Sequence, residues 1–156
     1  MQDKNPDHPR IIARPPFIYF AFIIIGAVLN RWWPMKMKLG GLSLPLGWGF
    51  IAVGLSLMTW GVLVMKKANT PVDPHETPTA LVVRGPFRFS RNPLYISLTL
   101  IYIGIAVLLR DGWIFCLLIP LLMAMYYGVI LREEEYLEKN FEEEYWKYKR
   151  TVRRWI

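Results

Sequence analysis

Four apolar stretches, separated by polar segments, dominate the chain. An α-helix needs about 20 mostly apolar residues to cross the ~30 Å hydrocarbon core of a bilayer, so stretches of this length predict transmembrane helices. The first stretch is short and ends in Trp32 and Trp33, side chains typical of the membrane interface. The pattern predicts one all-α membrane domain, 1–156, with about four transmembrane helices, at about residues 17–33, 47–65, 94–109 and 113–131.

Glycine and proline positions add detail to these helices. Residues 110–112 read Arg-Asp-Gly, a tight turn that makes the third and fourth helices an antiparallel hairpin. Pro120 is expected to kink the fourth helix. The second helix carries small residues that would let a neighbouring helix approach closely: Gly47, Gly49, Gly54 and Gly61.

Two polar segments are long enough to carry a function. Residues 66–93 contain five prolines, which exclude a regular helix, and a loop of this length is usually functional or disordered. The tail, 132–156, predicts an amphipathic helix at the membrane interface, although a soluble coiled-coil face has a similar pattern. Its apolar stripe consists of Leu137, Phe141, Tyr145, Tyr148, Val152 and Trp155.

The formal net charge of +7 is informative because of how the basic residues are distributed along the chain. With four transmembrane helices, the arm 1–16, the loop 66–93 and the tail 132–156 share one side of the membrane, with 15 Lys and Arg against 4 on the other side. The positive-inside rule places both termini in the cytoplasm. The same asymmetry explains the basic composition without a nucleic-acid partner.

The composition gives little support for a metal site or a catalytic nucleophile. The chain has one cysteine, Cys116, and two distant histidines, His8 and His75, so we expect no ordinary metal site. His75 can serve as a base, although a single histidine in a loop is usually only exposed. We find no phosphate-binding glycine loop, Ser-His-Asp set or Cys-His pair.

The start of the third helix is the first candidate site. Asn92 followed by Pro93 is a typical helix start, with Asn as the N-cap and Pro in the first turn. The nearby Arg84, Arg88 and Arg91 would then form an anion site with the positive end of the helix dipole. A capped helix with arginines placed by membrane topology gives the same pattern.

The end of the fourth helix is the second candidate site. Arg132 precedes three consecutive carboxylates, which are costly beside a bilayer unless they are hydrated or paired, and the arginines of the loop can neutralise them. Glu133 and Glu134 can also hold an amine or a sulfonium ligand. For Glu135 and Glu138 we favour a solvated helix face.

Taken together, these motifs resemble the isoprenylcysteine carboxyl methyltransferase and phospholipid methyltransferase superfamily of integral membrane enzymes. The resemblance covers about residues 70–155. It implies S-adenosylmethionine as methyl donor and a lipid acceptor that enters sideways between helices. Arg132 and Glu133 would be catalytic. The implied cofactor-binding residues are Gly85, Pro86, Arg88, Arg91, Asn92, Pro93, Tyr95, Glu133 and Glu134.

Asn92 departs from the pattern of this superfamily, because many relatives have histidine at this position. An imidazole can act as a base near neutral pH, whereas an amide cannot. Either a catalytic histidine is missing here, or the position only donates a hydrogen bond to the cofactor, which Asn can also do. We favour the second interpretation, because Asn also suits the helix cap.

The leading hypothesis is therefore S-adenosylmethionine-dependent methyl transfer to a lipid or lipidated small molecule at the cytoplasmic membrane face. A membrane reductase that uses a nicotinamide nucleotide is the main alternative among enzymes, since the loop arginines also suit its phosphates. A non-enzymatic membrane scaffold is the third hypothesis. The sequence does not identify the acceptor or the oligomeric state.

Overall fold

The computed structural model describes residues 11–74 and 76–155, and helices occupy most of this length. No strand occurs in these residues, so the expected all-α class is confirmed. The elements in chain order are α1 (Pro15–Trp32), η1 (Gly40–Leu42), α2 (Ser43–Lys67), η2 (Gly85–Arg88), α3 (Pro93–Leu109), α4 (Gly112–Cys116), α5 (Leu118–Met125), the π-helical η3 (Tyr126–Ile130) and α6 (Leu131–Thr151).

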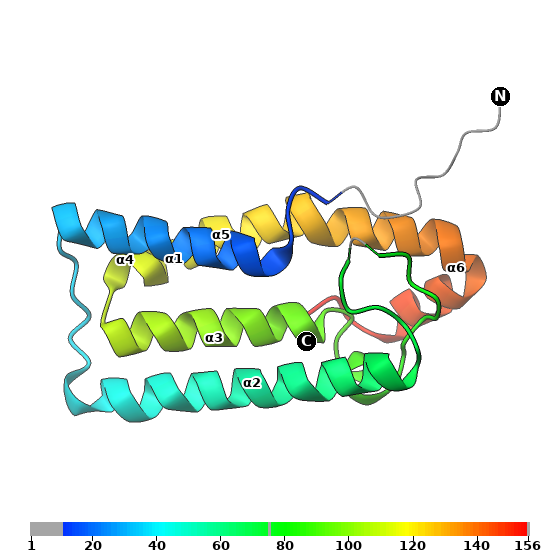
Figure 1. Ribbon diagram of the computed structural model, residues 1–156, viewed down its shortest axis with the longest axis horizontal. Coiled ribbons are helices and arrows are strands. Elements are labelled where there is room, and N and C mark those ends of the chain that lie inside the picture. Colours follow the sequence, from blue (N-terminus) through cyan, green and yellow to red (C-terminus); the bar gives the residue numbers. More distant parts are fainter. Residues whose placement is uncertain (1–10, 75, 156) are drawn as a thin grey trace.

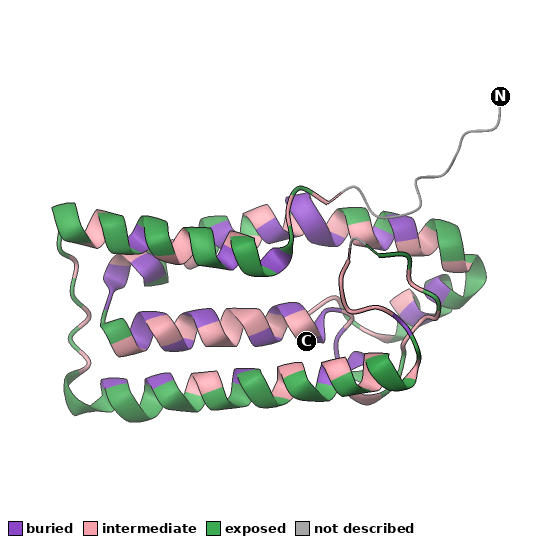
Figure 2. Cartoon of the chain, viewed as in Figure 1, coloured by how far each residue is buried: buried purple, intermediate pink, exposed green. Residues whose placement is uncertain are grey.

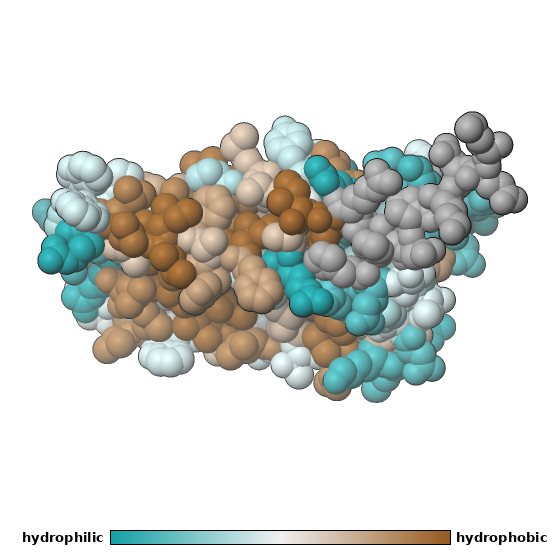
Figure 3. All heavy atoms as spheres, turned by 45° about the horizontal axis from the view of Figure 1, so that its top comes forward, coloured by the Kyte–Doolittle hydropathy of each residue, from teal (hydrophilic) through white to brown (hydrophobic). Residues whose placement is uncertain are grey.

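The helices lie along one common axis and alternate in direction (Figure 1). As a result α1 begins, α2 ends and α3 begins at one end of the molecule, where α6 also lies. We call this the polar end and define it as residues 11–14, 68–92 and 132–155. Hydrophilic side chains gather at this end, and apolar side chains cover much of the helical body (Figure 3).

The helical body has the character of a membrane protein. Three helical stretches, Pro15–Trp32, Gly40–Lys67 and Gly112–Thr151, are long and apolar enough to cross a bilayer. The apolar α3 is slightly shorter, with 17 residues. Outward faces of α1 and α2 expose large apolar side chains, while buried residues face the interior (Figure 2). These features make the chain an integral membrane protein of three to four spanning helices.

Glycines bring α2 and α3 into close contact. Gly47, Gly54 and Gly61 are the buried glycines of α2, spaced seven residues apart, so they lie on one face of the helix. A Cβ atom at Gly54 would lie 2.9 Å from the carbonyl oxygen of Ser97. The predicted close approach is therefore present at Gly47, Gly54 and Gly61 and leaves no room for a larger residue at Gly54, whereas for Gly49, which meets open space, the prediction was wrong.

The hairpin turn after α3 connects α3 to α4 and also contacts the linker between α1 and α2. Arg110 adopts a left-handed conformation (φ 53°), and the Asp111 carboxylate caps α4 by accepting hydrogen bonds from the amides of Trp113 and Ile114. The Gly112 amide donates to the Met35 carbonyl at 2.7 Å. The turn thus holds the linker between α1 and α2 against the end of α3.

Two irregularities interrupt the helical run from α4 to α6. The first lies at Leu117, between α4 and α5, one turn before Pro120, whose missing N–H weakens the helix there. The second is the π-helical turn η3, whose wider winding adds a residue to one turn. The Gly128 carbonyl in this turn accepts a hydrogen bond from the Ile12 amide at 3.1 Å, which fixes the segment just before α1 to this turn.

The glycine contact between α2 and α3 can be tested by a matched pair of substitutions. Gly54→Ala places a methyl group against backbone atoms, so we expect it to destabilise the protein by about 1–3 kcal/mol. Gly49→Ala on the same helix meets open space and should be neutral or slightly stabilising. Unfolding midpoints in detergent measure both effects, and equal midpoints for the two variants would contradict the close packing.

Candidate active site

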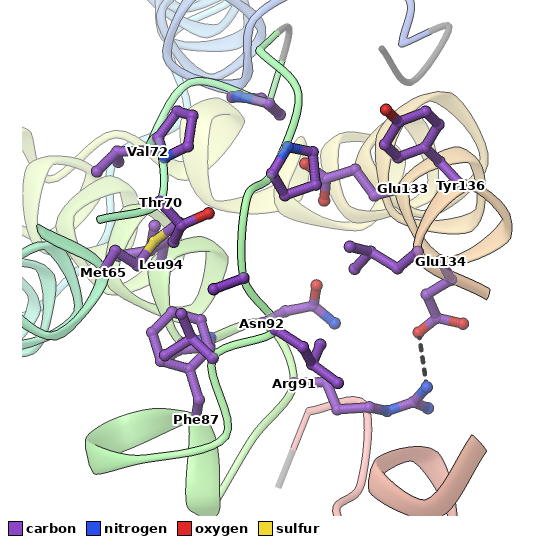
Figure 4. A pocket seen from close by; sticks show the side chains of 18 of the residues that line it. Met65, Thr70, Val72, Phe87, Arg91, Asn92, Leu94, Glu133, Glu134 and Tyr136 are labelled. Carbon is purple, nitrogen blue, oxygen red and sulfur yellow. Dashed lines mark ion pairs between the residues drawn. The ribbon is translucent and has the colours of Figure 1, made fainter. Parts of the chain in front are cut away.

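A cavity of about 150 Å³ lies at the polar end (Figure 4). This volume accommodates part of a ligand rather than one buried water molecule. One side of its wall is apolar, from the end of α2, the start of α3 and the loop before it, including Met65, Val82 and Leu94. Glu133, Glu134 and Tyr136 lie opposite Met65 and Leu94 in Figure 4. The wall also includes Arg91, Asn92, Tyr95, Tyr145 and Tyr148.

Glu133 lines the cavity, and no basic side chain of the described residues pairs with it. The Tyr95 hydroxyl donates a hydrogen bond to its Oε1 at 2.6 Å. Burial raises the pKa of Glu133 to about 7, the hydrogen bond from Tyr95 opposes this shift, and the charge of Glu134 adds to it. Near neutral pH this carboxyl group can therefore either hold or accept a proton.

Glu134 has the opposite environment, because two guanidinium groups contact it. Arg154 Nε and Nη2 donate to Oε1 and Oε2 at 2.8 and 2.7 Å, a bidentate pair. Arg91 Nη1 lies 3.2 Å from Oε1 and completes the cluster. The Glu134 side chain is only 7% exposed, so this charge is stabilised by its two partners rather than by water.

The Arg91 guanidinium group has more N–H donors than hydrogen-bond acceptors around it. Its side chain is 9% exposed, and among the described residues its Nε and Nη1 have no hydrogen-bond partner of good geometry. Tyr145 is close by: burial raises the pKa of this phenol to about 12, the charge of Glu134 adds to the shift, and the charge of Arg91 and a hydrogen bond with Arg91 oppose it. The cavity thus contains a buried cation with donors available to a ligand.

Asn92 occupies the N-cap position of α3 but does not cap it with its side chain, so that expectation was wrong. The Asn92 Nδ2 donates instead to the carbonyl of Arg154 at 3.0 Å, because the C-terminal segment packs against this position. The backbone amide of Asn92 donates a hydrogen bond to Ser90 Oγ at 3.1 Å. The expected proline at the first turn, Pro93, is present.

The structure brings six of the ten residues predicted from the sequence to the cavity wall: Arg91, Asn92, Pro93, Tyr95, Glu133 and Glu134. The other four, Gly85, Pro86, Arg88 and Arg132, do not line this cavity. Gly85 has a positive φ of 62° and lies against Val64 of α2. Arg84 and Arg88 are exposed because the short helix η2 turns Pro86 and Phe87 inward.

Sequence reasoning missed the contribution of the C-terminal segment. The chain bends at Glu142 (φ 37°, ψ −113°), and the part after it returns toward the start of α3 (Figure 1). Lys149 forms an ion pair with Glu138 across this bend. Tyr145 and Tyr148 of the apolar stripe therefore enter the cavity wall, and the Tyr148 hydroxyl donates to the Phe87 carbonyl at 2.6 Å.

The other acidic and metal-binding candidates contribute little here. Glu135 is exposed and pairs with Lys139, as expected for a solvated face. No cluster of histidine, cysteine and carboxylate side chains in the described residues could hold a metal ion. His8 and His75 lie outside the described residues, and Cys116 is exposed.

The fold and this site define a helical membrane protein with a charged, partly apolar cavity at one end of its helices. Comparison with known families gives the same result, since residues 42–144 match the phospholipid methyltransferase family. The chain belongs to this family, and the resemblance in the sequence is confirmed. It is a membrane protein of a lipid methyltransferase family.

One relative is an uncharacterized protein of Haemophilus influenzae. It is 36% identical over 63 residues, which are 40% of this chain and the whole of that protein. No solved structure matches the chain.

The protonation of Glu133 can be tested without any ligand. The pKa of this carboxyl in the folded protein, about 7, lies above its ordinary value of 4.5, so the stability that the protonated group contributes is lost as pH rises between these two values. We expect Glu133→Gln to raise the unfolding temperature in detergent, and by more at pH 8 than at pH 5. The matched control is Glu135→Gln, which lies on the exposed face and should show no such gain. An unchanged difference between the two pH values would contradict the shift.

Proposed function

We propose that the protein transfers a methyl group from S-adenosylmethionine to a lipid acceptor at the cytoplasmic face of the membrane. The observation that carries this proposal is the two-sided cavity. Its charged side suits a polar, water-soluble donor, and its apolar side, with Met65 and Leu94 from the membrane helices, suits an acceptor that stays in the bilayer. Membership of the phospholipid methyltransferase family supports the same chemistry.

The cavity residues fit the charges of S-adenosylmethionine. When bound, this molecule supplies a methyl group activated by a positively charged sulfur. Arg91 offers its buried N–H donors to a carboxylate. Glu133, which lacks a basic partner among the described residues, offers a negative charge to a sulfonium or ammonium group. Asn92 is committed to the Arg154 carbonyl through its Nδ2, and its side-chain oxygen remains as an acceptor.

We propose a second role for Glu133, as the base for an amine acceptor. An amine must lose a proton to accept a methyl group, and a carboxyl group with a pKa near 7 is suited to accept that proton. Glu134 is less suited, because two guanidinium groups stabilise its charge. Holding donor and acceptor in line supplies much of the remaining rate enhancement. A catalytic role for Arg132 stays a prediction from the resemblance.

The charge distribution supports the proposed orientation. The arm 1–16, the loop 66–93 and the tail 132–156 carry 15 of the 19 Lys and Arg residues of the chain. The positive-inside rule favours the cytoplasm for such a cluster, and the cavity lies at the same end of the helices. A soluble cytoplasmic donor would therefore reach the cavity from the water side.

Donor binding can be tested on purified protein in detergent. We expect S-adenosylhomocysteine to raise the unfolding temperature, and we expect Arg91→Ala and Glu133→Ala each to abolish this rise. Arg91→Ala should still fold, because Arg154 continues to neutralise Glu134. Arg150→Ala, which removes an exposed arginine outside the cavity, serves as the matched control and should retain the full shift.

The same measurement with NADPH separates the other hypotheses. Stabilisation by NADPH and not by S-adenosylhomocysteine would contradict the methyltransferase and support a membrane reductase. No stabilisation by either compound would support a non-enzymatic scaffold.

Methyl transfer itself is tested with labelled S-adenosylmethionine and a membrane lipid extract. If the acceptor is an amine, initial rates should rise with pH through about 7, because Glu133 must be ionised to accept a proton. Glu133→Gln should lower the rate by about 10²–10⁴-fold and remove this inflection. Glu135→Gln should behave like the wild type. The same pH profile in Glu133→Gln would contradict the role as base.

A further inference from the structure

The last residues of the chain close the charged side of the cavity. The Arg153 carbonyl accepts a hydrogen bond from the Arg91 amide at 3.0 Å, and the Arg154 carbonyl accepts bonds from Ser90 Oγ and Asn92 Nδ2 at 3.1 and 3.0 Å. The partly buried Trp155 packs against the core cluster of the helices. The C-terminal segment is therefore fixed at the start of α3, and its side chains have defined positions.

Arg154 is the best-satisfied cation of this segment. Nε and Nη2 bind the two oxygens of Glu134, and Nη1 donates to the Tyr126 hydroxyl at 2.9 Å. Its guanidinium also stacks over the Tyr126 ring, 5.0 Å from the centroid. All three guanidinium nitrogens are thus used, in a geometry that a lysine cannot reproduce.

The two arginines compete for the same carboxylate. Glu134 gives its bidentate interaction to Arg154, at 2.8 and 2.7 Å, and only a longer contact of 3.2 Å to Arg91. Arg91 consequently keeps buried donors without a hydrogen-bond partner among the described residues. Without Arg154, Glu134 would be free to pair fully with Arg91 and to occupy those donors.

We infer that Arg154 is a positioning residue that engages both oxygens of Glu134, limits the pairing of Glu134 with Arg91 and so keeps Arg91 donors available for an anionic group of a bound ligand. This inference rests on the proposed function, in which that group is the carboxylate of the methyl donor. Arg154 acts through Glu134 and Arg91 and does not itself line the cavity. Two guanidinium groups facing one carboxylate leave a net positive charge, which an anionic group of a ligand would neutralise.

The test is the affinity of the detergent-purified protein for S-adenosylhomocysteine, measured by isothermal titration. Arg154→Ala should weaken binding about tenfold or more, because Glu134 then takes the donors of Arg91. Arg154→Lys should fall between this variant and the wild type, because it restores the charge but not the bidentate geometry. Lys147→Ala, which removes an exposed cation of the same C-terminal segment, is the matched control and should bind normally.

A second substitution distinguishes positioning from a merely structural role. Adding Glu134→Gln to Arg154→Ala removes the competing charge, so we expect the double variant to recover affinity to within about threefold of the wild type. A double variant as weak as Arg154→Ala would overturn the inference, as would normal binding by Arg154→Ala alone. Absence of binding by the wild type would instead contradict the proposed function.

Tyr126→Phe keeps the test decisive if the double variant does not fold. It removes one hydrogen bond that orients Arg154 and leaves every charge in place. We expect a loss of about threefold in affinity, which Glu134→Gln should again reverse. An unchanged affinity in Tyr126→Phe would count against an oriented Arg154.

Discussion

The carboxylate of Glu134, held between two arginines, is the interaction on which the polar end depends. Its partners come from the residue before the N-cap of α3 and from the end of the chain, so one buried charge joins three segments. Arg91 could not be buried here alone without a large desolvation cost, and Glu134 could not be buried without its two partners. The cluster therefore requires the fold-back of the chain at Glu142, and it stabilises that fold-back in return.

This charge cluster also explains why the neighbouring carboxyl groups of Glu133 and Glu134 have such different surroundings. Glu134 is saturated by cations, whereas Glu133 meets a phenol and an apolar wall. Consecutive residues on a helix point about 100° apart, so Glu134 can meet the two arginines while Glu133 meets Tyr95. The pair thereby supplies an ion-paired carboxylate and a titratable group from a single helical turn.

The sequence was sufficient for the features that depend on local pattern. The apolar stretches indicated the helices, Gly54 indicated close packing, and six of the predicted site residues line one cavity. It did not reveal Arg154, because no spacing links that residue to Glu134 before the chain bends. The bend itself lies at Glu142, a residue that neither favours a positive φ nor breaks a helix, so the apolar stripe was interpreted as one continuous surface.

The π-helical turn Tyr126–Ile130 has a consequence for how this chain tolerates change in length. The wider winding absorbs one extra residue locally, so α6 keeps the rotational register that it would have without that residue. A deletion that this turn did not absorb would rotate α6 by about 100° relative to the membrane helices. Glu134 would then move into the place of Glu133, without its arginines. The π-helical turn therefore lets this apolar helix lose one residue and still present Glu133 to the cavity.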